Sequence, residues 1–228
     1  AVKRFDLVNN GDRIAVACSG GKDSLLLISV FKQLQQREDL NFDFQVIHLD
    51  QRQPGFDRST FDRSLERLGV HCEVIERDTW SVVEQKLKPG QIPCSICGRM
   101  RRGILNKWCA ENNFNKLALG HHLDDAMETF FLNLLFGRRL DPLKAITPAS
   151  ISTTLTIRPL IFVDERKIRS WLIRSNLDAV ACPVCDTFPR AKRRDIKGII
   201  QQFTELNPEI YSSMEQAIYG PSSPWTKV

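Results

Sequence analysis

The stretch Ser19-Gly20-Gly21-Lys22-Asp23-Ser24 decides the fold of this 228-residue chain. It follows the apolar run Ile14–Ala17 and precedes the apolar run Leu25–Val30, so the sequence predicts a strand, a glycine turn and a helix. Two adjacent glycines let the backbone approach a ligand closely, and the free N–H groups that begin the helix favour an anion there. Because Lys22 adds a positive charge, we expect a phosphate chain in the turn.

The turn differs from two familiar phosphate-binding loops. A Walker A loop needs glycine where Val16 stands and Ser or Thr where Asp23 stands, and the GxGxxG pattern of dinucleotide-binding folds is absent. Asp23 repels a triphosphate unless a cation intervenes, so we expect it near Mg²⁺ or within the turn's own hydrogen bonds. The pattern SGGxDS resembles the PP-loop signature of N-type ATP pyrophosphatases, enzymes that split ATP into a substrate adenylate and pyrophosphate.

Alternation of strand-like and helix-like segments before Gly137 predicts the fold class. We expect an α/β fold with a doubly wound, mainly parallel sheet, which the PP-loop resemblance places in the adenine nucleotide alpha hydrolase-like class. Ligands of such sheets bind beyond the carboxyl ends of the strands, where the strand order reverses. The predicted strands are Arg13–Ala17, Phe44–Leu49, His71–Ile75 and Lys116–Leu119, and the predicted helices are Lys22–Gln36, Phe56–Leu68, Arg99–Asn112 and Leu123–Phe136.

The last third of the chain reads as a small helical C-terminal extension. We expect residues 1–160 to form the PP-loop domain with the first CxxC, and residues 161–228 to carry the second CxxC and many basic residues. After Gly137, the predicted elements are a strand at Ile151–Leu160, which ends the first region, and three helices in the second. These helices run from the N-cap Asp164 to Ser175, over Asp195–Glu205 and over Pro208–Tyr219, and a mobile tail follows from Gly220.

Composition limits the class of protein. The 42% hydrophobic and 26% charged fractions are typical of soluble globular proteins, and no apolar run approaches the roughly 20 residues of a membrane span. The N-terminus does not resemble a signal peptide, so we expect no membrane and a cytoplasmic location. The net charge of +5 is compatible with a polyanionic partner.

Four of the seven cysteines form two CxxC pairs, and these pairs suggest a shared site. Cys94-Ser95-Ile96-Cys97 and Cys182-Pro183-Val184-Cys185 are both CxxC pairs, and such pairs serve as redox dithiols, zinc ligands or iron–sulfur ligands. The gap between them is far longer than in a zinc ribbon, so only the tertiary fold can bring them together. The cysteines alone leave these three uses open.

The order of the motifs narrows the choice. The chain carries the glycine turn, then the run from Pro93 to Gly103, then Gly120-His121-His122-Leu123-Asp124-Asp125, and late a CPxC. This order resembles the tRNA-cytidine 2-sulfurtransferase family. The resemblance implies a [4Fe–4S] cluster held by Cys94, Cys97 and Cys182, with Cys185 outside the ligand set. Three thiolates leave one iron open, which could bind hydrosulfide and present it as a nucleophile.

The resemblance also implies a reaction and roles for individual residues. ATP and Mg²⁺ would bind over Ser19–Ser24, cytidine 32 of the tRNA anticodon loop would be adenylated, and sulfur would then displace AMP. Lys22 and Asp23 are the predicted catalytic residues, with Lys22 offsetting negative charge and Asp23 positioning Mg²⁺. Other predicted nucleotide contacts are Ser19, Gly20, Gly21, Ser24, Asp50, Gly120, His121, Asp124 and Asp125. For Asp50 a turn cap, and for the helix-start acids complementarity to the helix dipole, remain alternatives.

Clustered basic residues predict contacts with RNA, since phosphate contacts dominate nucleic-acid affinity. The predicted RNA-binding residues are Arg99, Arg101, Arg102, Arg190, Lys192, Arg193 and Arg194, with a solvated helix face as the alternative for each cluster. The implied partners are tRNA and a cysteine desulfurase-type sulfur donor, and a homodimer is one option for the assembly. Competing functions are a PP-loop tRNA-uridine thiolase, a PP-loop enzyme with a small-molecule substrate and a zinc-stabilised RNA-binding module.

Overall fold

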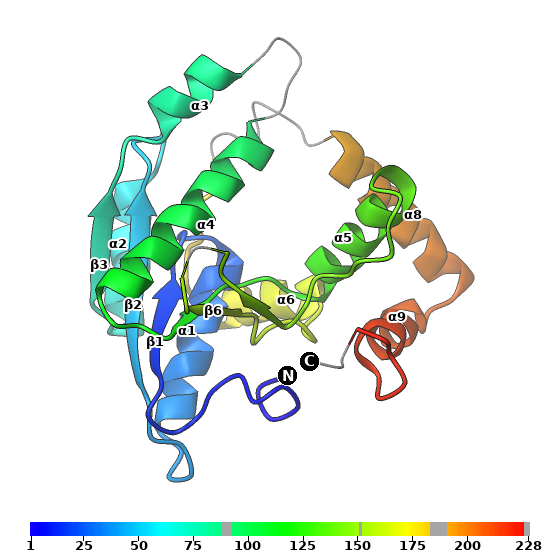
Figure 1. Cartoon of the computed structure of the whole chain (residues 1–228), viewed down its shortest axis with the longest axis horizontal. Coiled ribbons are helices and arrows are strands. Elements are labelled where there is room, and N and C mark those ends of the chain that lie inside the picture. The colour runs from blue at the N-terminus through cyan, green and yellow to red at the C-terminus, as the bar shows by residue number, and fades with distance from the viewer. Residues whose placement is uncertain (88–92, 151, 183–190, 226–228) are drawn as a thin grey trace.

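The computed structural model describes residues 1–87, 93–150, 152–182 and 191–225, without the side chains of Cys94, Ser95 and Ala191. Within these ranges the strands form one six-stranded sheet in the order β3-β2-β1-β4-β6-β5, and every pairing is parallel except that between β5 and β6 (Figure 1). The predicted α/β fold with a mainly parallel sheet is confirmed. The strands are β1 Arg13–Ala17, β2 Asp43–Asp50, β3 Cys72–Glu76, β4 Lys116–Ala118, β5 Ile146–Pro148 and β6 Leu155–Ile157.

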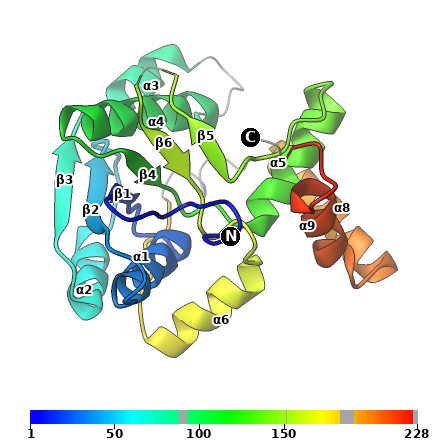
Figure 2. The same ribbon diagram turned by 60° about the horizontal axis from the view of Figure 1, so that its bottom comes forward.

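Helices cover both faces of the sheet (Figure 2). One face carries α1 (Lys22–Gln35), α2 (Arg58–Leu68) and α6 (Glu165–Ser175), and the other carries α3 (Trp80–Lys86) and α4 (Cys94–Glu111). A third group lies beside the β5–β6 end of the sheet and packs together: α5 (Leu123–Phe136), α8 (Ala191–Leu206) and α9 (Ile210–Tyr219). The division of the chain at residue 160 stays a prediction.

The alternation of side chains along β1 separates two apolar layers. Ile14 and Val16 are buried with the α1 side chain Phe31 on one face, whereas Ala15 is buried with Leu105 of α4 on the other. Successive strand residues point to opposite faces of the sheet. A strand covered by helices on both faces therefore buries every residue and needs an unbroken apolar run. This double burial explains why the segment Ile14–Ala17 is apolar throughout.

A buried ion pair holds the amino-terminal edge of the sheet. Lys116 Nζ lies 2.6 Å from Asp12 Oδ2, and the two side chains are only 6% and 7% exposed. Lys116 Nζ also donates to the Leu7 carbonyl at 3.1 Å, and Asn115 Nδ2 donates to Asp12 Oδ1 at 2.7 Å. Both charges of the pair therefore have further hydrogen-bond partners, and the pair lies at the opposite edge of the sheet from the carboxyl ends of the strands.

Several predicted boundaries are wrong. Helix α4 begins at Cys94 rather than Arg99, because Pro93, with a helical φ of −64°, serves as the N-cap and its carbonyl accepts from Cys97 N at 2.9 Å. Pro is well suited to a helix start because its missing N–H is not needed there. The first CxxC therefore forms the first turn of a helix.

Other differences lie in short or late elements. The sequence prediction missed α3 and β5, and it made the strand at Ile151–Leu160 too long, since β6 spans Leu155–Ile157 and a turn follows. Helix α8 begins four residues before the predicted Asp195, and α9 two residues after the predicted Pro208. In the tail from Gly220, which was predicted to be mobile, Trp225 Nε1 donates to the Leu140 carbonyl at 3.1 Å.

Candidate functional site

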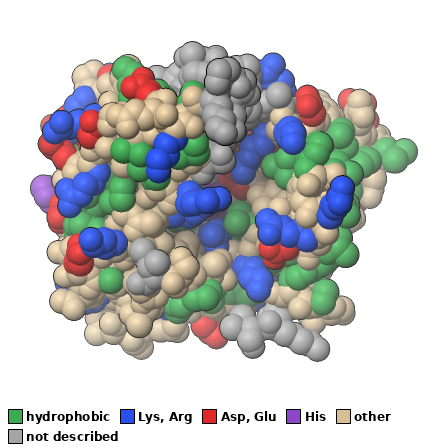
Figure 3. Space-filling view, turned by 45° about the horizontal axis from the view of Figure 1, so that its top comes forward, with side chains coloured by type: hydrophobic (Ala, Val, Ile, Leu, Met, Phe, Trp, Pro, Cys, Tyr) green, Lys and Arg blue, Asp and Glu red, His purple; other side chains and the backbone are tan. Residues whose placement is uncertain are grey.

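A cavity of about 910 Å³ opens at the carboxyl edge of the sheet, where β1 and β4 lie side by side and the strand order reverses. Its walls come from the glycine loop (Ser19–Ser24), the end of β2, the middle of α4, the loop after β4, and parts of α6 and α8. Viewed with this edge brought forward, the surface is hollowed, and Lys and Arg side chains gather around the hollow (Figure 3). The predicted position of the ligand site, beyond the carboxyl ends of the strands, agrees with this cavity.

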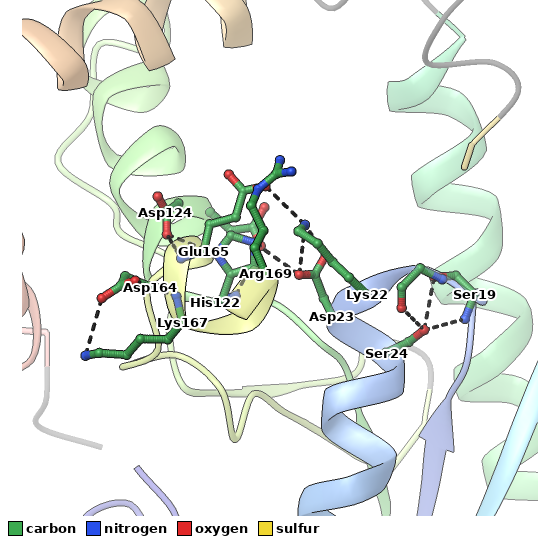
Figure 4. Close-up of polar contacts among 12 residues, drawn as sticks. Ser19, Lys22, Asp23, Ser24, His122, Asp124, Asp164, Glu165, Lys167 and Arg169 are labelled. Atoms are coloured by element: carbon green, nitrogen blue, oxygen red, sulfur yellow. Dashed lines mark hydrogen bonds and ion pairs between the residues drawn. The ribbon is translucent and has the colours of Figure 1, made fainter. Parts of the chain in front are cut away.

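The glycine loop is organised by its own serines (Figure 4). Ser24 Oγ donates to the Gly21 carbonyl at 2.8 Å and accepts from Ser19 N at 3.3 Å, while Gly21 N donates to Ser19 Oγ at 3.4 Å. Helix α1 begins directly after Gly21, and the first N–H groups of a helix have no partner within it. The loop thus holds a helix N-terminus at the cavity wall, which is a suitable arrangement for binding an anion.

A side chain at Gly20 or at Gly120 would clash, but with different parts of the protein. Gly20 has a φ of +80°, and a Cβ there would lie 2.9 Å from Phe61 and 3.0 Å from Val180, so the residue packs inward and does not line the cavity. Gly120 does line the cavity, and a Cβ there would lie 3.0 Å from the backbone carbonyl of Asp23. The loop after β4 therefore rests directly on the glycine loop.

Lys22 and Asp23 both line the cavity and are joined by opposite charge. Lys22 Nζ lies 3.0 Å from Asp23 Oδ1 and 3.2 Å from Glu165 Oε1. Burial acts to lower the pKa of Lys22, but the nearby carboxylates outweigh it and raise the pKa overall. Lys22 is therefore a cation at neutral pH, and two carboxylates hold it at the N-terminus of α1.

The histidines after β4 differ in charge. Burial lowers the pKa of His121 to about 4, so this cavity-lining imidazole is neutral, and its Nδ1 has no hydrogen-bond partner among the described residues. His122 lies 3.3 to 3.6 Å from carboxylate oxygens of Asp23, Asp124 and Asp125. Burial acts to lower the pKa of His122, but these carboxylates outweigh it and raise the pKa overall.

The acids at the start of α5 separate into two roles. Asp124 accepts hydrogen bonds from Tyr211 Oη and from Glu165 N, both at 2.7 Å, and it does not line the cavity. Both carboxylate oxygens therefore join α5 to α9 and α6, and the predicted contact of Asp124 with the nucleotide stays a prediction. Asp125 does line the cavity, while its Oδ2 accepts from His122 N at 3.1 Å.

Asp50 caps a turn and also lines the cavity, and its predicted contact with the nucleotide stays a prediction. Its Oδ1 accepts from Arg52 N at 2.8 Å, which is a turn cap, and the residue also lines the cavity at the end of β2. The neighbouring Gln51 lines the cavity too, and its Oε1 accepts from Cys97 Sγ at 3.3 Å. The end of β2 therefore connects the glycine-loop side of the cavity to the first CxxC.

The cysteines reach the cavity from two directions. Cys182 is exposed and lines the cavity, and Cys97 contacts its wall through Gln51. Cys94 stands three positions before Cys97 in α4, which places the two on the same face of the helix. The Cys94 side chain and Cys185 lie outside the described residues, and among those described no group of three His, Cys, Asp or Glu side chains is close enough to hold a metal ion.

The predicted RNA-binding residues divide between cavity and surface. Arg101 and Arg102 line the cavity, whereas Arg99, Lys192 and Arg194 are exposed, and Arg190 lies outside the described residues. Arg193 Nη1 instead lies 3.2 Å from Glu128 Oε2 and 3.4 Å from Asp125 Oδ1, so its charge faces acids of α5.

Sequence reasoning missed three charged residues in the wall of the cavity. Glu165 and Arg169 come from α6, and Lys197 comes from α8. The sequence signal for the first two was a Glu–Arg pair at a spacing of four on a helix with an Asp N-cap, which places both on one face. Nothing local indicated that this face would meet the glycine loop.

Comparison with known proteins now decides the family. Residues 2–185 match the PP-loop domain family. The chain belongs to this family. It is 36% identical over 209 residues to the tRNA-cytidine(32) 2-sulfurtransferase 1 of Francisella tularensis, which covers 92% of the chain and 78% of the relative. It is also 36% identical over 218 residues to the tRNA-cytidine(32) 2-sulfurtransferase of Alkalilimnicola ehrlichii, covering 96% of the chain and 69% of the relative.

These similarities make the chain a member of the tRNA-cytidine(32) 2-sulfurtransferase family and therefore a transferase, as the motif order predicted. Among solved structures, it matches the U34-tRNA thiolase NcsA from Methanococcus maripaludis with its [4Fe–4S] cluster, at a TM-score of 0.74 and 22% identity over 93% of this chain and 73% of that one. This match supports the fold. No helix in the described part of the chain is long and apolar enough to cross a membrane.

Proposed function

We propose that this PP-loop protein uses ATP to thiolate cytidine 32 of tRNA at the 2-position. The observation that carries the proposal is the shared cavity, because the glycine loop and Cys182 line the same space and Cys97 contacts its wall. The relatives with 36% identity are named for this reaction. An adenylation site and a cysteine site in one cavity suit a reaction that activates and then thiolates the same base.

In the proposed reaction the 2-oxygen of cytidine attacks the α-phosphorus of ATP, and pyrophosphate leaves. Sulfur then forms a bond to C2, and the C2–O bond breaks as AMP departs with the former base oxygen. The start of α1 and Lys22 are placed to bind phosphates and offset their negative charge. Asp23 lines the same cavity and would position Mg²⁺, since carboxylates are ligands that Mg²⁺ prefers.

The donor set fits an iron–sulfur cluster. Cys94 and Cys97 stand three positions apart in the first turn of α4, Cys97 contacts the cavity wall through Gln51, and Cys182 lines the cavity from the segment after α6. Thiolates are the ligands of such clusters. A [4Fe–4S] cluster at these three cysteines would supply sulfur as a nucleophile. Gln51 would orient Cys97, because Gln51 Oε1 accepts a hydrogen bond from the Cys97 thiol.

The neutral His121 and the cationic Arg101 and Arg102 have positions that suit the RNA. All three line the cavity, so they are placed to contact an inserted nucleotide and the phosphates beside it. Taking a base out of its stack costs a few kcal/mol, and less in a loop than in a duplex. Phosphate contacts from arginine contribute sequence-independent affinity that offsets this cost.

The experiment is mass spectrometry of tRNA nucleosides from a strain that lacks the gene, complemented with variants. Native protein should restore 2-thiocytidine, whereas Lys22→Gln and Cys97→Ala should not. Lys107→Gln is the matched control, because this exposed lysine of α4 lies outside the cavity wall and should restore it fully. Unchanged 2-thiocytidine in the deletion strain, with loss of a thiolated uridine instead, would refute the proposal in favour of a uridine thiolase.

A further inference from the structure

The carboxylate of Glu165 gathers cations from three helices. It lies 3.2 Å from Lys22 Nζ of α1, 2.8 Å from Arg169 Nη2 of α6 and 2.6 Å from Lys197 Nζ of α8. All four residues line the cavity, and the Glu165 side chain is only 13% exposed. Figure 4 shows Glu165, Arg169 and Lys22 turned toward one another beside the glycine loop.

This cluster carries more positive than negative charge. Three cations surround Glu165, and of these three Asp23 contacts only Lys22. Burial acts to raise the pKa of Glu165, but the hydrogen bond from Lys197 and the charge of Lys22 outweigh it and lower the pKa to about 2. The carboxylate is therefore ionised at neutral pH, and the cations around it form a site for a further or larger anion.

A purely structural role explains the cluster less well. The side chains of Arg169 and Lys197 are 62% and 56% exposed, and ion pairs at such exposure contribute little to stability. Both side chains are also long enough to move from a carboxylate to a phosphate within the same cavity. Arg in particular binds phosphate through two parallel N–H donors, which a single carboxylate oxygen does not use.

The N-terminus of α6 does not itself provide the anion site. Two of its first three N–H groups already have partners, since Glu165 N donates to Asp124 Oδ2 at 2.7 Å and Lys167 N donates to Asp164 Oδ1 at 3.0 Å. The anion that the cluster would accept must therefore be bound by side chains. The glycine loop, with the open N-terminus of α1, lies next to the cluster and would hold the neighbouring part of the same anion.

We infer that Arg169 and Lys197 bind the terminal phosphates of ATP, and that Glu165 is an internal counter-ion which holds these cations and Lys22 until the phosphates replace it. The inference rests on the proposed use of ATP in this cavity. It makes α6 and α8, far from the glycine loop in sequence, parts of the triphosphate site. Pyrophosphate, the leaving group of adenylation, would be released from the same side chains.

The test compares the binding of ATP, pyrophosphate and AMP by calorimetry with the full chain. Arg169→Gln and Lys197→Gln should each weaken ATP and pyrophosphate binding about five- to tenfold and change AMP binding less than twofold. Lys167→Gln is the matched control, since this lysine of α6 is 73% exposed, pairs with Asp164 and does not line the cavity. It should leave all three affinities unchanged.

The charge-keeping variants Arg169→Lys and Lys197→Arg should restore most of the ATP affinity. Their behaviour separates phosphate binding from folding, because a variant that merely misfolds loses AMP binding as well. Equal ATP-to-AMP affinity ratios in the native protein and in both glutamine variants would overturn the inference. If the native chain bound neither ATP nor AMP, the proposed function itself would fail, which is a different result.

Glu165→Gln tests the counter-ion directly. Removing the negative charge should lower the melting temperature of the ligand-free protein, because Lys22, whose side chain is only 21% exposed, loses one of its carboxylate partners. The same variant should bind pyrophosphate at least threefold more tightly than the native protein, since the phosphates no longer compete with a carboxylate. Weaker pyrophosphate binding by Glu165→Gln than by the native protein would overturn the counter-ion role.

Discussion

The substitution Gly120→Ala tests whether the contact between the loop after β4 and the glycine loop is needed for nucleotide binding. The new Cβ would lie 3.0 Å from the Asp23 carbonyl carbon and oxygen and 3.2 Å from Ser24 N. Ordinary contact begins at 3.4 Å, so the two loops must separate by about 0.4 Å (3.4 minus 3.0). The obstacles are backbone atoms at the start of α1, which cannot swing aside as a flexible side chain can.

The expected effect follows from this displacement. Adding a methyl group to a tightly packed site costs about 1–3 kcal/mol, which lowers the melting temperature by roughly 2–12 °C in a domain of this size. The bound state needs the two loops in contact, so about 1–1.4 kcal/mol of this strain should oppose ATP binding and weaken it about five- to tenfold. Calorimetric titration with ATP and thermal unfolding followed by circular dichroism measure the two effects.

Gly103→Ala is the matched control. Gly103 lies inside α4, and a Cβ there would meet nothing within 4 Å, so the variant should keep native ATP affinity and gain about 0.5–1 kcal/mol of stability. The reasoning is refuted if Gly120→Ala binds ATP within twofold of the Gly103→Ala variant. In that case the close approach of the two loops has no part in forming the phosphate site.

Three further predictions concern stability, the cysteines and pH. Lys116→Met leaves Asp12 buried without its cation and should cost about 3 kcal/mol in thermal unfolding with ATP affinity unchanged, whereas Lys107→Met on the surface should cost under about 1 kcal/mol. Cys182→Ala should abolish thiolation and the visible absorbance of anaerobically purified protein, while calorimetry should show native ATP binding. The lowered pKa of Glu165 contributes stability above its ordinary value of 4.5 that is lost toward about 2, so the melting-temperature difference between native protein and Glu165→Gln should shrink as the pH falls through that window.

The parallel sheet and the position of its ligand site could be predicted because local signals determine both. Apolar strands such as Ile14–Ala17 are buried on two faces, and the turn at Gly20 and Gly21 has few other uses. Once the strands are parallel, the residues that follow them must gather at one edge. Asp50 and Gly120 therefore reach the same cavity as the glycine loop, as expected from sequence position alone.

The charges of the cavity wall could not be predicted, because they depend on how separate helices meet. In the basic run of α6, Arg169 faces the cavity with Glu165, whereas Arg166 lies 5.1 Å from the ring centroid of Tyr211 and Lys167 pairs with Asp164. A count of basic residues treats the three alike, although the helical period points them in different directions.

Tertiary contacts also change the meaning of single residues. Arg193 belongs to a basic run that predicts RNA binding, yet it pairs with Asp125 and Glu128 of α5. Asp124 and Asp125 are the same residue type side by side in the sequence, but the Asp124 oxygens bind α6 and α9. The sequence shows no difference between neighbouring acids, because partners 41 and 87 residues away decide their roles.

The most direct test of the central claim follows the base oxygen itself. Unmodified tRNA carrying ¹⁸O at the 2-position of cytidine 32 would be incubated anaerobically with the cluster-loaded protein, ATP, Mg²⁺ and sulfide, and both products analysed by mass spectrometry. The account predicts 2-thiocytidine at that position and one equivalent of ¹⁸O in AMP. Formation of 2-thiocytidine with the label in water instead of AMP would contradict activation of the base in the ATP cavity.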